Sequence, residues 1–564
     1  MIKLHRTITS ILITCILFLN AKITVGQLSI DSAKFIIKRS VDNGRSLGMV
    51  VGIINEKGRQ VFGYGKINNN GTKQPDGNTL FEIGSVTKTF TSLVLADMIS
   101  KGQLKLNDPI SKFLPKIVKT PTRNGKEITL ADLVTHTSGL PFVPDNVGLQ
   151  NPSNPYINYT EKQLYNFLSR YTLTRDIGSK YEYSNVGFGL LGHILTIVSG
   201  KSYETLVKET ICAPLKMTRT VVSITSELQK NLATGYDVNE KAVQYLDFSV
   251  LDGCGALRSN VNDLLNYAAA NMGLMRTNLD TAIELIHKTH DSNTDALGWG
   301  FIENNGKQIY WHNGGTYGCS AYFGFDLKSK TGVVVLSNSV NRIDDIALHI
   351  LDSKVPVLHM DKVVQVSDTI LKTYTGIYKK EDGTTRTIIK KGNNLWFNSY
   401  DPNSTPNFRS GKMHFTSNTD FFTYLYPTES SIYLDSLNRV SGLRIKGGNA
   451  YAKKVDSLDL SFDGFNGLAW SALEVKDYSN AFFYLQQGLK RDSANLFLLG
   501  NLAHTYLFTG NYSKAIEIYK KHIGQNLPNY SSWVGMIISD FKTLKADGLP
   551  VEPMNKVLKE LDIE

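Results

Sequence analysis

The stretch from Phe81 to Leu104, "FEIGSVTKTFTSLVLADMISKGQL", places a hydroxyl group and an amine three residues apart, at Ser85 and Lys88. The apolar residues that follow recur at the spacing of a helix, and Gly102 is a natural helix stop. They are Val86, Phe90, Leu93, Val94 and Met98. We therefore expect a helix that begins at Ser85, with Lys88 one turn further on and facing the same way.

This helix start carries the elements of nucleophilic catalysis. A free hydroxyl group is a poor nucleophile and needs a neighbouring base. A lysine amine, with an ordinary pKa of about 10.4, can serve where burial and the positive end of a helix disfavour its charged form. The same helix end offers N–H groups to a developing oxyanion. A serine at a helix start is also a common cap, so the pattern by itself leaves both interpretations open.

Two further stretches bear on that choice. "KYEYSNVGFGLLGHIL" contains Tyr183 and Asn185 ahead of an apolar helix, and "YWHNGGTYG" puts His312, Gly314 and Gly315 at a strand edge. In this order the chain resembles the serine β-lactamase and penicillin-binding-protein superfamily, whose motifs are S-x-x-K, Y-x-N and K-T-G or H-x-G. The Tyr-x-Asn form is similar to the class C β-lactamase, DD-peptidase and esterase branch, and the resemblance covers about residues 35–345.

The resemblance implies three catalytic residues. Ser85 resembles the acylated nucleophile, and Lys88 resembles the partner that shuttles its proton. Tyr183 resembles the phenol that protonates the leaving group and helps to activate water. The alternative for Tyr183 is a buried aromatic residue of the core. His136, in "THTSGL", is expected to hydrogen-bond within the core and not to catalyse.

The same resemblance implies four substrate-binding residues. Asn185 is similar to the amide that binds the motif lysine and the substrate, or it is a helix cap. His312 takes the place of a cationic lysine beside a substrate carboxylate, or it is an ordinary strand histidine. Gly314 lets the strand backbone approach the ligand. The N–H groups of Gly315 and of the nucleophile, Ser85, would form an oxyanion hole.

Two departures from the family pattern bear on the substrate. His312 is only partly charged near neutral pH and so would hold a carboxylate less firmly than lysine does. The glutamine that precedes a "VPD"-like stretch in class C enzymes is absent here, since Phe142 runs directly into Val143. Serine chemistry is expected to remain, with less efficient β-lactam turnover.

The order of predicted elements indicates a mixed α/β fold with two extensions. Residues 27–360 predict a hydrolase domain with an antiparallel sheet, built from both ends of the segment and flanked by helices, and a helical lobe. Residues 366–455 predict a small β-rich domain that resembles the lipocalin-like extension of such hydrolases. Residues 460–564 predict a tetratricopeptide-like helical domain, because Tyr478 and Tyr512 repeat at 34 residues. These repeats either dock on the enzyme or present a groove to a protein partner.

The beginning of the chain reads as an export signal. Lys3 and Arg6 precede the apolar run "ITSILITCILFL", so residues 1–26 are expected to be a signal peptide of a periplasmic or secreted protein. We expect no integral membrane span once it is removed. Three cysteines then remain, Cys212, Cys254 and Cys319, either as free thiols or with one bridge.

The sequence therefore predicts an exported serine hydrolase that acts on a β-lactam or a related amide or peptide through an acyl-enzyme on Ser85. The alternatives are a carboxylesterase or D-amino-acid peptidase on the same scaffold, and a non-catalytic binder that acts through the repeats. No metal ion or organic cofactor is expected, because no metal-ligating motif is present. The net charge of +10 is spread without a basic block, so we expect no nucleic-acid partner.

Overall fold

A computed structural model gives the fold of this 564-residue chain. It describes residues 30–147, 154–288, 296–304, 306–381, 385–400, 408–424, 429–445, 451–455, 462–474, 476–527, 532–546 and 548–563. The expected signal peptide and Cys15 lie outside these residues. Within the described part, no helix combines the length and the apolar character that crossing a bilayer requires.

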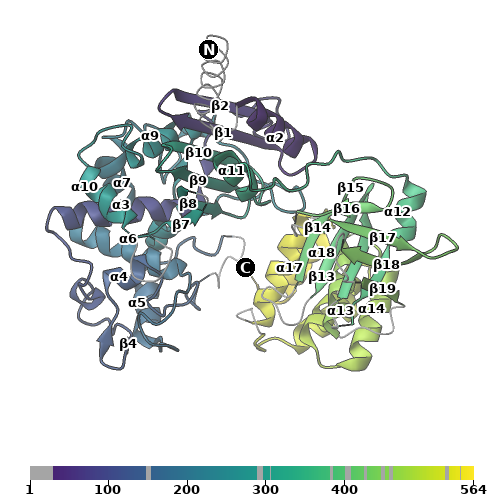
Figure 1. The fold of residues 1–564 in the computed structure, drawn as a ribbon. Helices are drawn as coiled ribbons and strands as arrows, with labels where there is room; N and C mark the ends of the chain where they lie inside the picture. The colour runs from purple at the N-terminus through teal and green to yellow at the C-terminus, as the bar shows by residue number, and fades with distance from the viewer. Residues whose placement is uncertain are drawn as a thin grey trace, which may run out of the picture.

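A six-stranded antiparallel sheet forms the centre of the first part of the chain (Figure 1). Its strands in spatial order are β2 (Gly58–Gly65), β1 (Gly48–Asn55), β10 (Thr331–Ser337), β9 (Ser320–Asp326), β8 (Lys307–Gly315) and β7 (Gly300–Asn304). Met49 pairs with Ser337, so the first and last strands of this part meet. The predicted sheet from both ends of the segment is confirmed.

The two faces of this sheet pack against different helices. The alternation of β1 sends Met49 and Val51 to one face, where they are buried with α2 (Ile30–Asp42) and α11 (Asp344–Leu351). Val50, between them, belongs to the larger core on the other face. The remaining helices of this part are α3 (Thr87–Ser100), α4 (Leu130–Val134), α5 (Glu161–Arg170), α6 (Asn185–Ser199), α7 (Tyr203–Val207), α8 (Ser226–Gln229), α9 (Val261–Asn271) and α10 (Asp280–His287).

Short elements complete this part of the fold. They are the strands β3 (Phe81–Glu82), β4 (Thr122–Arg123), β5 (Lys126–Glu127) and β6 (Arg258–Ser259), and the short 3₁₀ or π turns η1 (Gly84–Val86), η2 (Ile110–Lys112), η3 (Lys208–Cys212) and η4 (Ser249–Cys254). Strand β3 lies directly before η1 in the chain, and its antiparallel pairing with β6 fixes the approach to the first motif.

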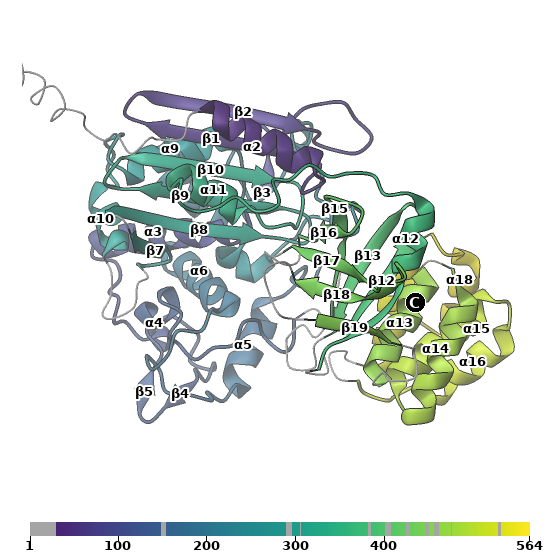
Figure 2. The same cartoon turned by 45° about the vertical axis from the view of Figure 1, so that its right-hand side comes forward.

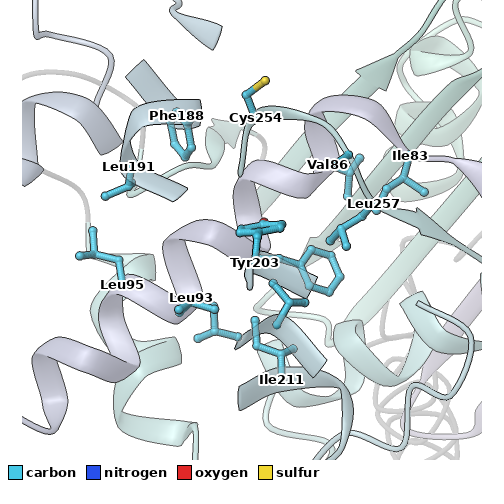
Figure 3. Packing of buried hydrophobic residues seen from close by; sticks show 14 of the residues in the cluster. Ile83, Val86, Leu93, Leu95, Phe188, Leu191, Tyr203, Ile211, Cys254 and Leu257 are labelled. Atoms are coloured by element: carbon cyan, nitrogen blue, oxygen red, sulfur yellow. The ribbon is translucent and has the colours of Figure 1, made fainter. Parts of the chain in front are cut away.

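The helix predicted from Ser85 begins two residues later than predicted and is deeply buried. Ser85 lies in η1, and α3 begins at Thr87. Every residue from Thr87 to Met98 is buried, so α3 runs through the core and does not lie on its surface with one apolar face. Figure 3 shows side chains of the helix start, α6 and α7 gathered in this core. They include Ile83, Val86, Phe188, Leu191 and Tyr203.

A nine-stranded antiparallel sheet follows the short helix α12 (Asp368–Tyr374). Its strands in spatial order are β14 (Phe408–Lys412), β13 (Asn394–Tyr400), β12 (Thr385–Lys391), β11 (Gly376–Lys379), β19 (Tyr451–Val455), β18 (Val440–Ile445), β17 (Ser430–Leu434), β16 (Asp420–Phe422) and β15 (His414–Phe415). The two outer strands, β14 and β15, are joined in the chain by Met413 alone. The sheet therefore curls round a buried cluster that includes Met413, Tyr378 and Phe421.

Six helices end the chain and pack beside this second sheet (Figure 2). They are α13 (Phe462–Glu474), α14 (Tyr478–Arg491), α15 (Leu496–Phe508), α16 (Tyr512–Lys521), α17 (Trp533–Ala546) and α18 (Val551–Glu560). Lys391 of β12 forms an ion pair with Glu474 of α13 at 2.6 Å, and Ile377 shares a buried cluster with Phe465. The predicted β-rich module and C-terminal helices are thus present, and the helices dock on the β-rich module.

Candidate active site

Lys88 connects the first two motifs. Its side chain is fully buried, and its Nζ donates to Ser85 Oγ at 3.1 Å, to Asn185 Oδ1 at 2.8 Å and to the carbonyl oxygen of Cys254 at 2.6 Å. An ammonium group has three hydrogens, so these acceptors account for all of them. Among the described residues Lys88 pairs with no carboxylate. The amine therefore stands between a hydroxyl group and an amide, where it can take up or return a proton.

Asn185 reaches this position because a neighbouring residue caps the helix. The Ser184 hydroxyl group accepts a hydrogen bond from the Gly187 N–H at the start of α6, so Ser184 is the cap. Asn185 is the first residue of α6, and its amide oxygen is free to accept from Lys88. The helix-cap alternative for Asn185 is wrong.

Tyr183 lies beside the amine and above a buried histidine. The Lys88 Nζ is 4.8 Å from the centroid of the Tyr183 ring. The His136 ring is 4.4 Å from the Tyr183 ring, and its Nδ1 accepts a hydrogen bond from the Ser184 N–H at 3.0 Å. Burial lowers the pKa of His136 well below its usual value, which keeps that acceptor unprotonated. His136 thus holds the Tyr-x-Asn segment through its contact with the Tyr183 ring and its hydrogen bond with the Ser184 N–H.

The third motif lies against the turn that carries Ser85. A Cβ atom on Gly314 would fall 1.9 Å from the carbonyl oxygen of Ile83 and 3.1 Å from the Ser85 nitrogen. A Cβ atom on Gly84, whose φ is +48°, would fall 2.9 Å from the Gly315 nitrogen. Both glycines are needed for this approach. The structure therefore brings the end of β8 and the nucleophile turn into direct backbone contact.

Glu82 ties these two segments together. The Thr316 hydroxyl group donates to its Oε2 at 2.7 Å, and the Leu246 N–H donates to its Oε1 at 2.7 Å. The Arg258 guanidinium lies 3.7 Å away, and both charged side chains are only 4% exposed. Burial raises the pKa of Glu82, while Thr316 and Arg258 oppose that rise. Sequence reasoning gave Glu82 and Thr316 no role, because their pairing is a contact between distant segments.

His312 lies on β8 at the edge of the site and is 9% exposed. Its Nδ1 donates to the carbonyl oxygen of Asn313 at 2.5 Å, and its ring centroid is 6.4 Å from that of Tyr183. Burial, together with the charge of Lys88, lowers the pKa of His312 to about 3. His312 is therefore neutral at physiological pH, and the expectation of a partly charged group does not hold here.

A cavity of about 180 Å³ opens beside Tyr183 and His312. Residues that bear aromatic or imidazole rings make up half of the residues that line it. The ring-bearing residues are His136, Tyr181, Tyr183, Trp299, Trp311 and His312. Trp299 is buried in the core, at 2% exposure, and both tryptophans also line this cavity.

The cysteines and metal-binding groups add little to the site. Cys212, Cys254 and Cys319 are all buried free thiols, which decides between the two alternatives left by the sequence. Cys254 contributes its backbone carbonyl to Lys88, and not its thiol. Over the described ranges, no three His, Cys, Asp or Glu side chains gather into a group that could hold a metal ion.

Known proteins resemble the first part of the chain in sequence. A family model described as "Beta-lactamase" matches residues 34–351. A beta-lactamase of Pseudomonas fluorescens is 28% identical over 335 residues, which cover 52% of this chain and 88% of that protein. The D-alanyl-D-alanine-carboxypeptidase/endopeptidase AmpH of Escherichia coli (strain K12) is 36% identical over 170 residues. That match covers 30% of this chain and 44% of the E. coli protein, which is less than half its length.

Solved structures share the fold. A class C beta-lactamase in complex with cefoxitin superposes with a TM-score of 0.52 at 23% identity, over 57% of this chain and 98% of that one. The octameric penicillin-binding protein homologue from Pyrococcus abyssi superposes with a TM-score of 0.53 at 21% identity, over 76% of this chain and all of that one. At these identities the likeness concerns the fold.

Proposed function

The chain belongs to the β-lactamase family of serine hydrolases, and on this premise we propose that it cleaves an amide, peptide or ester bond through an acyl-enzyme on Ser85. One observation carries the proposal: the buried Lys88 amine lies within hydrogen-bond distance of both Ser85 Oγ and Asn185 Oδ1. A nucleophile held by a base that is itself oriented by a third group is the arrangement that covalent catalysis requires. β-Lactams, D-amino-acid peptides and small esters all share this route.

The proposed first step forms the acyl-enzyme. Lys88 enters this step as the neutral amine, with the hydrogen bond between Ser85 Oγ and Lys88 Nζ reversed. Ser85 Oγ attacks the substrate carbonyl carbon while Lys88 takes the hydroxyl proton. The N–H groups of Ser85 and Gly315 receive the developing oxyanion, which the close approach of β8 to the nucleophile turn makes available. The bond to the leaving group then breaks, and Tyr183 passes a proton to it. Lys88 lies 4.8 Å from the Tyr183 ring, so the proton need not travel far.

The proposed second step hydrolyses the acyl-enzyme and regenerates free Ser85. A water molecule attacks the acyl carbon, its proton passes to Tyr183 or Lys88, and Ser85 leaves with a proton from the same pair. Asn185 holds Lys88 in both steps and contacts the substrate amide. No metal ion or organic cofactor takes part in this scheme.

We further propose roles for the rest of the chain. Residues 1–26 would direct export to the periplasm or beyond, because Lys3 and Arg6 precede an apolar run of signal-peptide length. Residues 27–360 would form the hydrolase, 366–455 the lipocalin-like module and 460–564 tetratricopeptide-like repeats. The starts of α13 and α15, at 462 and 496, and of α14 and α16, at 478 and 512, support the repeat, since both pairs are 34 residues apart. A protein partner would bind the face of the repeats that the β-rich module leaves uncovered.

Intact-mass spectrometry tests the proposed chemistry. The mature protein and its Ser85→Ala variant are each mixed with a penicillin, a D-alanyl-D-alanine peptide and a small ester, and substrate loss is followed in the same tube. We expect adducts or turnover that depend on Ser85, with unchanged thermal unfolding of the variant. A Ser85→Ala protein that keeps its turnover would contradict the proposal. If the native protein forms no adduct with any of the three substrates and consumes none of them, the result would instead favour a non-catalytic binder.

A further inference from the structure

The wall around His312 indicates which substrates this site selects. Resting on the proposed function, we infer that the hydrolase prefers substrates with an uncharged aromatic or apolar leaving group over substrates whose leaving group carries a carboxylate. His312 and the ring-lined cavity beside Tyr183 would set this preference.

The first support is the hydrogen-bonding state of His312. Its Nδ1–H is already donated to the carbonyl oxygen of Asn313, 2.5 Å away. A neutral imidazole has a single N–H, so the other ring nitrogen, Nε2, carries a lone pair and can only accept. A carboxylate needs N–H donors or a positive charge. The residue at this position therefore offers a carboxylate neither of them.

The groups around His312 keep it in that state. Burial and the charge of Lys88 both disfavour a positive charge on His312. The Asn313 side chain donates a hydrogen bond to Asp344 on α11 at 2.5 Å. This bond fixes the position of Asn313, whose backbone carbonyl accepts the hydrogen bond from His312 Nδ1. Lys88 itself has donated its hydrogens to Ser85, Asn185 and Cys254. The nearest cation is therefore committed elsewhere.

The second support is the chemistry of the cavity. Of the described residues that line it, none is Lys, Arg, Asp or Glu. Trp299 and Tyr181 are among its aromatic lining residues, and its volume of about 180 Å³ exceeds the roughly 150 Å³ of an apolar cavity known to hold benzene. A phenyl-sized group fits this space, while the described lining residues offer a carboxylate there no cationic side chain to offset its lost hydration.

The third support is the surface at the mouth of the site. Phe142 is 56% exposed and Tyr181 is 40% exposed, although both are large apolar side chains. Their rings are near the Tyr183–His136 pair, since Phe142 lies 6.1 Å from Tyr183 and Tyr181 lies 5.5 Å from His136. Exposed aromatic side chains next to a reactive centre are typical of a surface that an apolar ligand covers.

Two esters that differ in one group test the inference. Phenyl acetate and 3-carboxyphenyl acetate share an acyl group and differ in the leaving-group carboxylate. We expect kcat/KM at pH 7.5 to be at least about tenfold higher for phenyl acetate, the scale of a lost hydrogen bond to a charged group. In His312→Lys, the ratio should fall by about tenfold or invert. A native preference for the carboxylated ester, or a His312→Lys ratio equal to that of the native protein, would overturn the inference.

A second variant keeps the test decisive if His312→Lys unfolds. Tyr181→Ala should lower kcat/KM for phenyl acetate and leave that for methyl acetate nearly unchanged, because Tyr181 lines the cavity and methoxide does not fill it. Equal losses for both esters would argue against the cavity as the leaving-group site. Failure of the proposed function gives a different result, namely that neither ester is hydrolysed in a manner that depends on Ser85.

Discussion

Gly314 lies so close to Ile83 that a Cβ atom on the glycine would fall 1.9 Å from the Ile83 carbonyl oxygen. Two segments more than 200 residues apart in the chain are thus held in backbone contact beside the proposed nucleophile. Backbone atoms cannot move aside as the end of a flexible side chain can. The end of β8 can therefore lie this close to the Ser85 turn only because residue 314 is a glycine, which has no side chain.

We expect Gly314→Ala to push β8 away from the Ser85 turn. Removing one oxyanion donor from its position costs about 10²–10³ in kcat, and the variant should lose activity on that scale. Steady-state kinetics together with thermal unfolding would compare the variant with the native protein. Native activity in Gly314→Ala would contradict the role given to this contact.

Lys88 allows a test of the base. Lys88→Arg keeps a positive charge, but a guanidinium group is not deprotonated in proteins and cannot accept the Ser85 proton. Acylation, measured as the rate of adduct formation under single-turnover conditions, should fall by at least about 10²-fold, which is the scale of general-base catalysis. Full acylation by the variant would show that the amine acts only as a charge.

The relative positions of residues within one short motif could be predicted from the sequence. Ser85 and Lys88 are three residues apart on one helix start, and Tyr183 and Asn185 flank a helix cap, so spacing alone brings each pair to one side. The sheet was also predicted from local signals, because strand-like runs stand at both ends of the segment, and β1 pairs with β10.

Contacts between distant segments were missed, and burial explains most of the differences. The Cys254 carbonyl that holds Lys88 is a backbone group, which no residue type announces. The spacing of apolar residues predicted the helix α3 but gave no sign that its Thr91 and Ser92 would also be buried. The Thr91 hydroxyl group donates to the carbonyl oxygen of Gly253 at 2.7 Å, and the Ser92 hydroxyl group donates to that of Lys88 at 2.9 Å. Because both hydroxyl groups have buried partners, the helix can be buried on all sides. His312 loses its charge for the same reason, since its burial comes from tertiary packing.

Glu82 should matter to both stability and catalysis. Glu82→Gln removes the charge that faces Arg258 at 3.7 Å in a buried setting and weakens the acceptor for Thr316. Breaking a buried pair from one side costs about 3–5 kcal/mol, so we expect a loss in the free energy of unfolding near the lower end of that range and a lower kcat. Asp247→Asn is the control, because this second partner of Arg258 is 56% exposed and such pairs contribute about 0–1 kcal/mol. Similar losses in urea unfolding for both variants would contradict the assignment.

The β-rich module should lose stability in acid through His414. This side chain is 6% exposed, and burial, with Lys412 and His359 nearby, lowers its pKa to about 3. An unfolded histidine titrates near 6.5. Between these values the unfolded state binds a proton that the folded state does not, so stability falls as the pH drops from about 6.5 toward 3.

The size of this effect has an upper limit. One such histidine contributes at most about 1.4 kcal/mol per pH unit. We expect His414→Gln to reduce the slope of unfolding free energy against pH, measured by urea unfolding between pH 6.5 and 4.5. Parallel pH profiles for the variant and the native protein would exclude His414 as a source of acid sensitivity.

Phe465 should be the residue through which the C-terminal helices hold the β-rich module. Phe465 of α13 is fully buried in one cluster with Ile377 of β11 and Leu498 of α15. Phe465→Ala should lower the stability of the module and helices by about 3–5 kcal/mol. Phe483→Ala is the control, since that ring is 40% exposed and should change stability by no more than about 0.5 kcal/mol. Kinetics should be unchanged in both variants, because the Ser85 site lies in the other part of the chain. A loss of kcat in Phe465→Ala would show instead that the helices support the active site. A melting profile identical to that of Phe483→Ala would show that the packing around Phe465 does not contribute to stability.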